Sequence, residues 1–416
     1  MPQCVKPAAS VHPVLFLILF LPMGMANGYV VVTLGYLLSK AGVSVDAIAT
    51  LVSLSLLPQT WKFIGAPLVD ATLDNKRWYV ISAATGGLLI AATAFVPIVS
   101  ANLLLFDALV FTFNVAVSFN AMAADSLMAY ATTPEQKGRA GGWSQAGNLG
   151  GSGLGGGAAL WLTQHVAMGW VAGAALGTMC ILSSLALIFV KEPVSLHRAE
   201  RLAESLLNVG RDVWSVARSP KGFLALAVLI LPISVGAAQN LWAAVAGDWH
   251  ASGDVVALVN GALGGVISMF GCVIGGWICD QMDRKTAINL FSVILALSAV
   301  AMALAPRTQE MFVVFTCLYA FIMGFCYAAF GAVALEAIGA GAAATKYNVL
   351  ASVANLATIY LTKIEGWAQT RFGSTAMLWT EALVPIAGTC IFILIALATR
   401  RFFVAGPAAG ARAKSY

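Results

Sequence analysis

Charged residues are scarce in this sequence of 416 residues. Only 10% of them are Asp, Glu, Lys or Arg, whereas 60% are hydrophobic, and a soluble domain is about 25% charged. Uncharged stretches of about 20 residues recur, which is the length that crosses a bilayer as a helix. Backbone groups must pair internally in lipid, and the alternating pattern of membrane strands is missing. We therefore predict an all-α membrane protein.

The sequence also has few histidines and no closely spaced pair of cysteines. The four His residues fall near the ends of apolar stretches or between them, and the seven Cys residues are scattered without a CxxC pair. The apolar stretches therefore contain no Ser/Cys–His pair, no HExxH zinc motif and no histidine relay. We expect no enzyme activity, no metal site and no cofactor.

The apolar stretches predict twelve transmembrane helices. They cover residues 14–38, 46–69, 79–99, 102–130, 138–163, 168–190, 220–247, 254–279, 286–305, 310–337, 344–370 and 376–399. Residues 191–219 form a longer connection with apolar residues at helical spacing, as in a helix that lies on a membrane surface. We predict an N-terminal half (1–190), this cytoplasmic amphipathic linker (191–219), a C-terminal half (220–399) and a cytoplasmic tail (400–416).

Lysine and arginine indicate the orientation of these helices. Eighteen of the 23 basic residues fall on the side of the two termini, three fall on the other side, and Lys62 and Lys363 lie within spans. Cytoplasmic loops are enriched in Lys and Arg, so both termini are predicted to be cytoplasmic. The net charge of +5 then reflects topology and indicates no nucleic-acid partner.

The two halves repeat each other. With a shift of 210 residues, the tract GAPLVDATLDNKR that contains Asp70 aligns with GGWICDQMDRK, which contains Asp280. Two six-helix pseudo-repeats with this tract after spans two and eight resemble the major facilitator superfamily, whose binding site lies between the repeats near the midplane. The resemblance implies gating loops at Asp70, Arg77, Asp280, Arg284 and Lys285.

Three tracts resemble one branch of that superfamily, the muropeptide permeases (AmpG-like) and acetyl-CoA transporters. They are KFIGAPLVD from Lys62, TPEQKG from Thr133 and ATKYNVLAS from Ala344. In span four that branch reads D-A-W or D-G-W, whereas Asp125 is followed here by Ser-Leu. The resemblance implies a secondary active transporter that moves a hydrophilic, muropeptide-like solute across the bacterial inner membrane by alternating access. A siderophore or CoA-thioester transporter, or a non-transporting receptor or scaffold, is the alternative.

Lys62 lies inside an apolar span, where a charge costs about 2.5–3.5 kcal/mol. It either snorkels to the headgroups or faces a cavity or a carboxylate. Asp125 in span four lies at a similar depth, on one helical face with Asn114 and Ser118. We predict that Lys62 and Asp125 pair or face the cavity together and bind substrate. The alternative is an ion pair that only orients helices.

Other polar side chains are predicted to bind substrate or protons. In the superfamily spans one, four, seven and ten line the cavity, which adds Asn27, Tyr29, Gln239, Asn240 and Trp242, and span eleven contributes Asn355. Each amide could instead bond a neighbouring helix. Asp125 and Glu336 are the predicted proton-coupling residues, because intramembrane carboxylates often belong to proton relays. Glu336 could alternatively reach the headgroups.

Two further contacts are predicted. Lys363 in span eleven should pair with Glu381 or Glu365 for structural reasons. Spans five and eight are rich in glycine, and small faces let helices approach and slide. In the superfamily that the chain resembles, spans five and eight meet across the two halves. The resemblance therefore implies that the faces Gly147/Gly151/Gly155, Gly261/Gly265 and Gly271/Gly275 meet between the halves, the alternative being packing within one half. The expected partners are a small-molecule substrate, protons and the lipid bilayer, and the expected state is a monomer.

Overall fold

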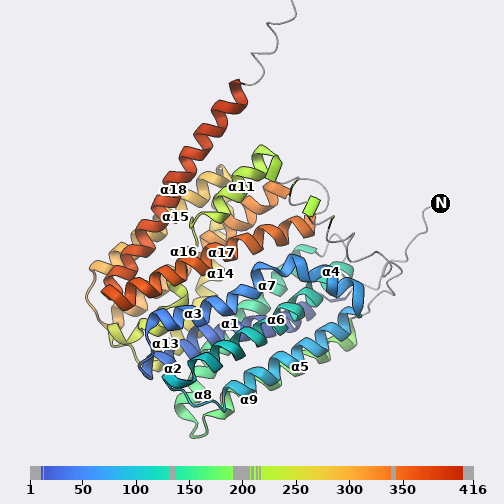
Figure 1. Cartoon of the computed structure of the whole chain (residues 1–416), viewed down its shortest axis with the longest axis vertical. Coiled ribbons are helices and arrows are strands. Elements are labelled where there is room, and N and C mark those ends of the chain that lie inside the picture. The colour runs from blue at the N-terminus through green and yellow to red at the C-terminus, as the bar shows by residue number, and fades with distance from the viewer. Residues whose placement is uncertain are drawn as a thin grey trace, which may run out of the picture.

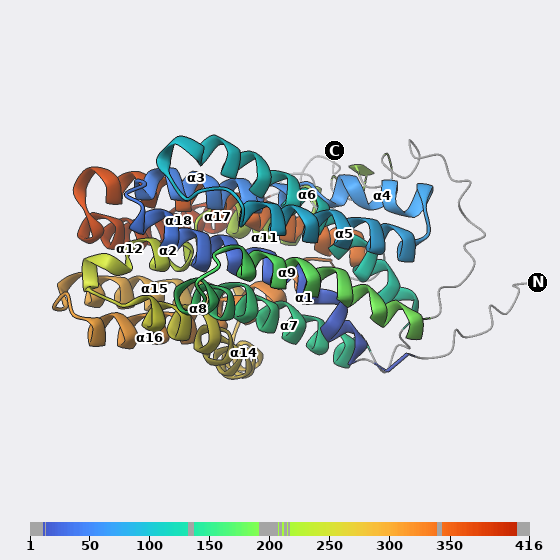
Figure 2. The same ribbon diagram turned by 90° about the horizontal axis from the view of Figure 1, so that it is seen from below.

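The computed structural model describes residues 11–12, 14–131, 137–190, 207, 210–211, 214, 217–338 and 343–405. All regular structure within these ranges is helical. Two helical bundles lie side by side, one from the first half of the chain and one from the second (Figure 1). Figure 2 shows the helices of both halves from below.

The N-terminal bundle contains the first six predicted spans. Its helices are α1 (Leu15–Gly28), η1 (Tyr29–Leu34), α2 (Gly35–Lys40), α3 (Val45–Leu56), η2 (Leu57–Thr60), α4 (Lys62–Thr72), α5 (Asn75–Thr93), η3 (Ser100–Asn102), α6 (Leu103–Ala131), α7 (Lys137–Gly153), η5 (Leu154–Ala158), α8 (Ala159–His165), α9 (Trp170–Leu182) and η6 (Ser183–Phe189).

The C-terminal bundle contains the other six. Its helices are α11 (Pro220–Ile230), η7 (Ala237–Asn240), α12 (Trp242–Val245), η8 (Ala246–Trp249), α13 (Gly253–Val256), η9 (Ala257–Leu263), α14 (Gly264–Gln281), α15 (Arg284–Leu304), α16 (Gln309–Ile338), α17 (Ala343–Phe372) and α18 (Ser374–Ala405). Helix α18 continues beyond the predicted end at residue 399. Most of the predicted linker, and the tail beyond Ala405, lie outside the described residues.

Seven of the described helical segments are long and apolar enough to cross a membrane. Predicted spans two and seven are interrupted. Span two breaks at Leu57–Trp61, where Pro58 enters a 3₁₀ turn and Trp61 leaves helical geometry with φ −120°. Lys62 is therefore the first residue of α4 rather than a residue inside one continuous helix.

Span seven breaks after α11. Ser234 and Gly236 both have positive φ, at 57° and 61°. The positive φ of Gly236 favours glycine at this position, and a side chain there would also require the end of the Met323 side chain to move. The break leads directly into η7, which carries Gln239 and Asn240.

The glycine faces pack differently from the prediction. A Cβ at Gly147, Gly151 or Gly155 would collide with backbone of α1 in the same half. Gly271 and Gly275 likewise pack against α16 within the C-terminal half. Only part of the expected seam is present, where Gly157 meets Gly261 across the halves. The prediction was wrong for the first and third faces because periodicity identifies a small face but not the neighbour that covers it.

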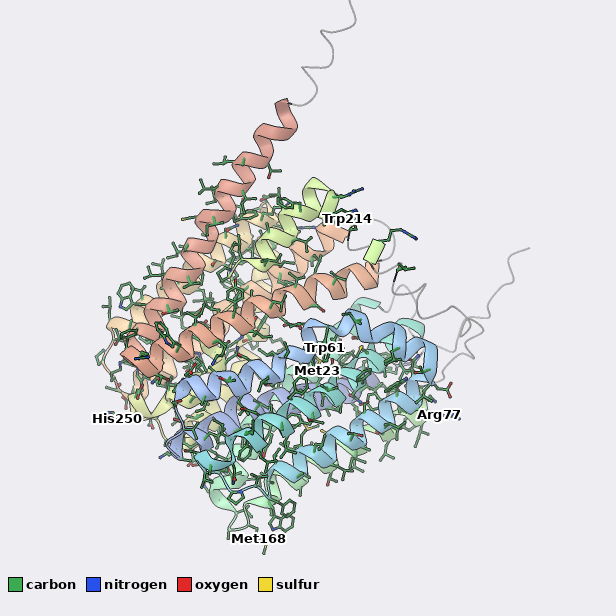
Figure 3. All side chains as sticks on the ribbon, in the orientation of Figure 1. Met23, Trp61, Arg77, Met168, Trp214 and His250 are labelled. Atoms are coloured by element: carbon green, nitrogen blue, oxygen red, sulfur yellow. The ribbon has the colours of Figure 1, made fainter. Side chains whose placement is uncertain are left out.

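The two ends of the molecule differ in charge. One end, called the basic end here, carries Lys76, Arg77, Arg284 and Lys285. Figure 3 places Arg77 at this end, and Met168 and His250 at the other, here called the far end. Trp61 lies near the boundary of the two halves (Figure 3), where η2 packs against α17.

Candidate functional site

The predicted Lys62–Asp125 pair is present. The Lys62 Nζ lies 3.6 Å from Asp125 Oδ2, and the side chains are 16% and 36% exposed. The break at Trp61 sets the start of α4, and α4 packs against α6, which carries Asp125. The two charges thus balance each other while one of them stays accessible, which is compatible with ligand exchange.

The predicted substrate contacts in spans one and four fall into two groups. Asn27 is exposed although its neighbours on α1 are buried. Three others are buried and already bonded: Tyr29 Oη to Thr93 Oγ1 at 2.9 Å, Asn114 Nδ2 to Val110 O at 2.9 Å, and Ser118 Oγ to Pro58 O at 3.3 Å. Their part in substrate binding stays a prediction.

The predicted contacts in span seven hold the C-terminal half together. Gln239 Nε2 donates to Tyr327 Oη at 2.8 Å, and Asn240 Nδ2 donates to Thr362 Oγ1 of α17 at 3.1 Å. Trp242 is 3% exposed and packs edge-on against Tyr319. Asn355 is half-buried on α17. The alternative noted for such amides, bonding to a neighbouring helix, is what Asn240 does here.

The predicted gating residues lie at the basic end. Arg77 Nε is 3.4 Å from Asp74 Oδ2, and Arg284 Nη1 donates to Ala332 O at 3.4 Å. Lys285 follows Arg284 at the start of α15, where Asp283 caps the helix by accepting from Thr286 N at 2.9 Å. Burial raises the pKa of Asp283, but the Thr286 hydrogen bonds and the Lys285 charge together bring it below its ordinary value. The side chains of Asp70, Asp280 and Glu336 lie outside those described.

The predicted partner of Lys363 was wrong. Its Nζ lies 2.9 Å from Asp46 Oδ1 and 2.6 Å from Thr50 Oγ1, both on α3 of the other half. Glu365 follows two residues later, so the 3.6-residue period turns it about 200° away, to the opposite side of α17. The lysine therefore joins the two halves instead of neutralising a carboxylate in its own half.

A family model described as Major Facilitator Superfamily matches residues 15–362. The chain belongs to the major facilitator superfamily. It is therefore a multi-pass membrane protein and a secondary transporter of a small-molecule substrate, not an enzyme. No curated protein matches it in sequence.

Solved transporter structures share the fold of this superfamily member at low identity. A POT family transporter in complex with a thioalcohol-conjugated peptide has a TM-score of 0.69 at 11% identity, covering 93% of this chain and 96% of that chain. The nucleoside transporter NupG has a TM-score of 0.65 at 12% identity, covering 94% of this chain and 98% of that chain. The xylose transporter XylE from E. coli, in a partially occluded inward-open conformation, has a TM-score of 0.67 at 14% identity, covering 91% of this chain and 96% of that chain.

Sequence reasoning missed a pair of acids in the C-terminal half of this transporter. Glu365 on α17 and Glu381 on α18 are both 0% exposed, and their carboxyls lie within hydrogen-bonding reach of each other. The signal was available, because Lys363 and Glu365 are two residues apart on one helix and cannot share a face. Glu365 therefore needed a partner other than that lysine.

Polar contacts between the halves gather at the far end of the transporter. Besides the Lys363–Asp46 pair, Ser39 Oγ donates to Ala244 O at 2.5 Å, and Asp46 N donates to Thr370 Oγ1 at 2.9 Å. His165 Nε2 lies 3.8 Å from Asp254 Oδ1. These contacts tie α2, α3 and α8 to the C-terminal half, so the halves are joined at the far end in this conformation.

Proposed function

We propose that this transporter is a proton symporter that carries a hydrophilic, muropeptide-like solute with anionic or amide groups across the bacterial inner membrane. The observation that supports it most is the partly exposed Lys62–Asp125 pair. A solute carboxylate that approaches Lys62 competes with Asp125, and protonation of Asp125 frees the lysine for that solute.

The substrate class is supported by two further observations. The tracts at Lys62, Thr133 and Ala344 resemble the muropeptide permease branch. The similar structures are a POT family transporter in complex with a conjugated peptide, a nucleoside transporter and a xylose transporter, and peptides, nucleosides and xylose are hydrophilic. A siderophore or a CoA thioester fits the same paired charges and is the alternative substrate.

Alternating access in this proposal uses the two halves as rocking units. In this proposal the basic end faces the cytoplasm, which the excess of Lys and Arg on that side supports. The far-end contacts then close the outer side in this conformation, and the tracts of Asp70–Arg77 and Asp280–Lys285 control the cytoplasmic side. A monomer suffices, because both halves of the site come from one chain.

Uptake into proteoliposomes tests the proposal. A panel of labelled muropeptide, ferric siderophore and acetyl-CoA is offered to the wild-type protein and to the Lys62→Ala, Asp125→Asn and Arg371→Gln variants. Arg371 is an exposed cation at the end of α17, so its removal controls for charge alone. We expect flux of a panel member, at least about tenfold slower in the first two variants (1.4 kcal/mol) and unchanged in the third.

Two results would contradict it. Equal flux with Lys62→Ala and wild type would remove the lysine from substrate binding and leave the pair an orienting contact. Binding of a panel member without any flux in the wild-type protein would favour the receptor or scaffold alternative.

A further inference from the structure

The Glu365–Glu381 pair lies deep in the C-terminal half. Glu365 is seven residues from the end of α17 and Glu381 seven from the start of α18, which places both about 10 Å from the far end of their helices. Neither side chain is exposed. The pair is therefore sealed from water in this conformation.

The surroundings of the pair supply no cation among the described residues. From α16 the titratable groups are Tyr319, whose Oη donates to Glu381 Oε1 at 2.5 Å, and Cys326. From η7 the backbone N–H of Ala238 donates to Glu381 Oε2 at 3.2 Å. Lys363, on the opposite side of α17, bonds Asp46 and Thr50 instead.

The two acids differ in their hydrogen bonds. Glu381 accepts hydrogen bonds from Tyr319 and Ala238, whereas both carboxyl oxygens of Glu365 lack a donor within the described part of the chain. A buried carboxylate without a donor or a cation is strongly unfavourable, and two neighbouring carboxylates do not both ionise readily. One proton between them satisfies both conditions, since the carboxyl that holds it donates to the other.

The pair also touches the interrupted span seven. The Ala238 N–H that Glu381 accepts belongs to η7, directly after the break at Ser234 and Gly236. The same segment carries Asn240, bonded to Thr362 of α17, and leads into α12, whose Ala244 accepts from Ser39 of the other half. A change in charge at Glu381 thus acts on a segment that reaches both α17 and the far-end contact.

We propose that Glu365 and Glu381 form a proton-binding site that holds one proton between their carboxyls and whose occupancy sets the position of span seven. On release, the O–H bond of the protonated carboxyl breaks, the proton passes to water admitted by opening of the half, and the second carboxylate becomes charged as well. Proton binding stands by itself, whereas the role of this proton in driving solute rests on the proposed function.

Infrared spectroscopy of the protein in lipid membranes tests proton binding without a solute. The carbonyl stretch of protonated carboxylic acids is followed from acidic to alkaline pH in the wild type and in the Glu365→Gln, Glu381→Gln and Glu310→Gln variants. Glu310 is an exposed carboxylate in the first turn of α16 and serves as the matched control. We expect one titrating component that wild type and Glu310→Gln share and that both other variants lose.

A titrating component that persists in Glu365→Gln and Glu381→Gln, or the absence of any titrating component in wild type, overturns the proposal. Size-exclusion profiles and melting curves confirm that each variant is folded. If neither pair variant folds, the same titration of Tyr319→Phe decides, because loss of a donor to Glu381 must shift the component if the pair carries it.

Muropeptide flux separates this site from the proposed function. With a pH gradient, the pair variants should lose the acceleration that the gradient gives to wild type while they keep solute exchange at equal pH. If the pair variants keep both solute exchange at equal pH and the acceleration by the pH gradient, the coupling role is refuted. Absence of muropeptide flux in wild type contradicts the proposed substrate and leaves the infrared result to judge the pair.

Discussion

The two halves of this transporter carry opposite kinds of acidic site. In the N-terminal half Asp125 faces Lys62, and both side chains are partly exposed. In the C-terminal half Glu365 faces Glu381, and both are fully buried. In the first site the charges of Lys62 and Asp125 balance each other, and a charged group from the solvent can replace one partner. In the second site two buried carboxylates need a proton or a cation to balance their charge. Two repeats of one fold can thus divide the recognition of a solute and the storage of a proton between them.

A charge swap in the N-terminal half should have the largest effect. If the pair only orients α4 and α6, the Lys62→Asp/Asp125→Lys protein should transport normally, because the exchanged charges still attract each other. We expect instead that it recovers the melting temperature lost in Lys62→Ala but transports at least about tenfold more slowly (1.4 kcal/mol), because the solute needs the cation on α4. Wild-type uptake by the swapped protein would remove the functional contrast between the two sites.

Removal of one acid from the C-terminal pair should have an intermediate effect, visible in the pH dependence of stability. Raising the pH removes the shared proton and leaves two buried charges, so wild-type stability should fall at alkaline pH. Glu365→Gln supplies an N–H donor to Glu381 and should flatten this fall. Melting temperatures over a pH series check it, with Glu310→Gln expected to follow wild type. A steeper fall in Glu365→Gln would contradict the shared proton.

The contact between the halves should have the smallest effect. Lys363 and Asp46 are 37% and 40% exposed, and exposed ion pairs contribute about 0.2–1 kcal/mol. Lys363→Ala and Asp46→Asn should each lower stability by this small amount, and the double variant should be no worse than either single one. Additive losses in this double-mutant cycle would show that the pair does not join the halves.

Much of the fold was predictable because hydropathy, loop charge and the internal repeat each report on a whole segment. The Lys62–Asp125 contact was predictable as well, since two opposite charges at one depth in a membrane attract each other. The partner of Lys363 was not, because it depends on how far α17 is rotated. The prediction for the glycine face of α7 was wrong for a related reason. Gly151 indicates that another helix packs closely, but the sequence does not indicate that this helix is α1.

The break in span two has one more consequence. Because α4 begins at Lys62, the lysine stands at the positive end of that helix's dipole, where a second positive charge is unfavourable by about 0.3–1 kcal/mol. Asp125 therefore offsets two sources of positive potential, the ammonium of Lys62 and the positive end of the helix dipole. A solute anion that displaced Asp125 would be attracted by both. The break in span two therefore adds the attraction of a helix N-terminus to that of the Lys62 ammonium.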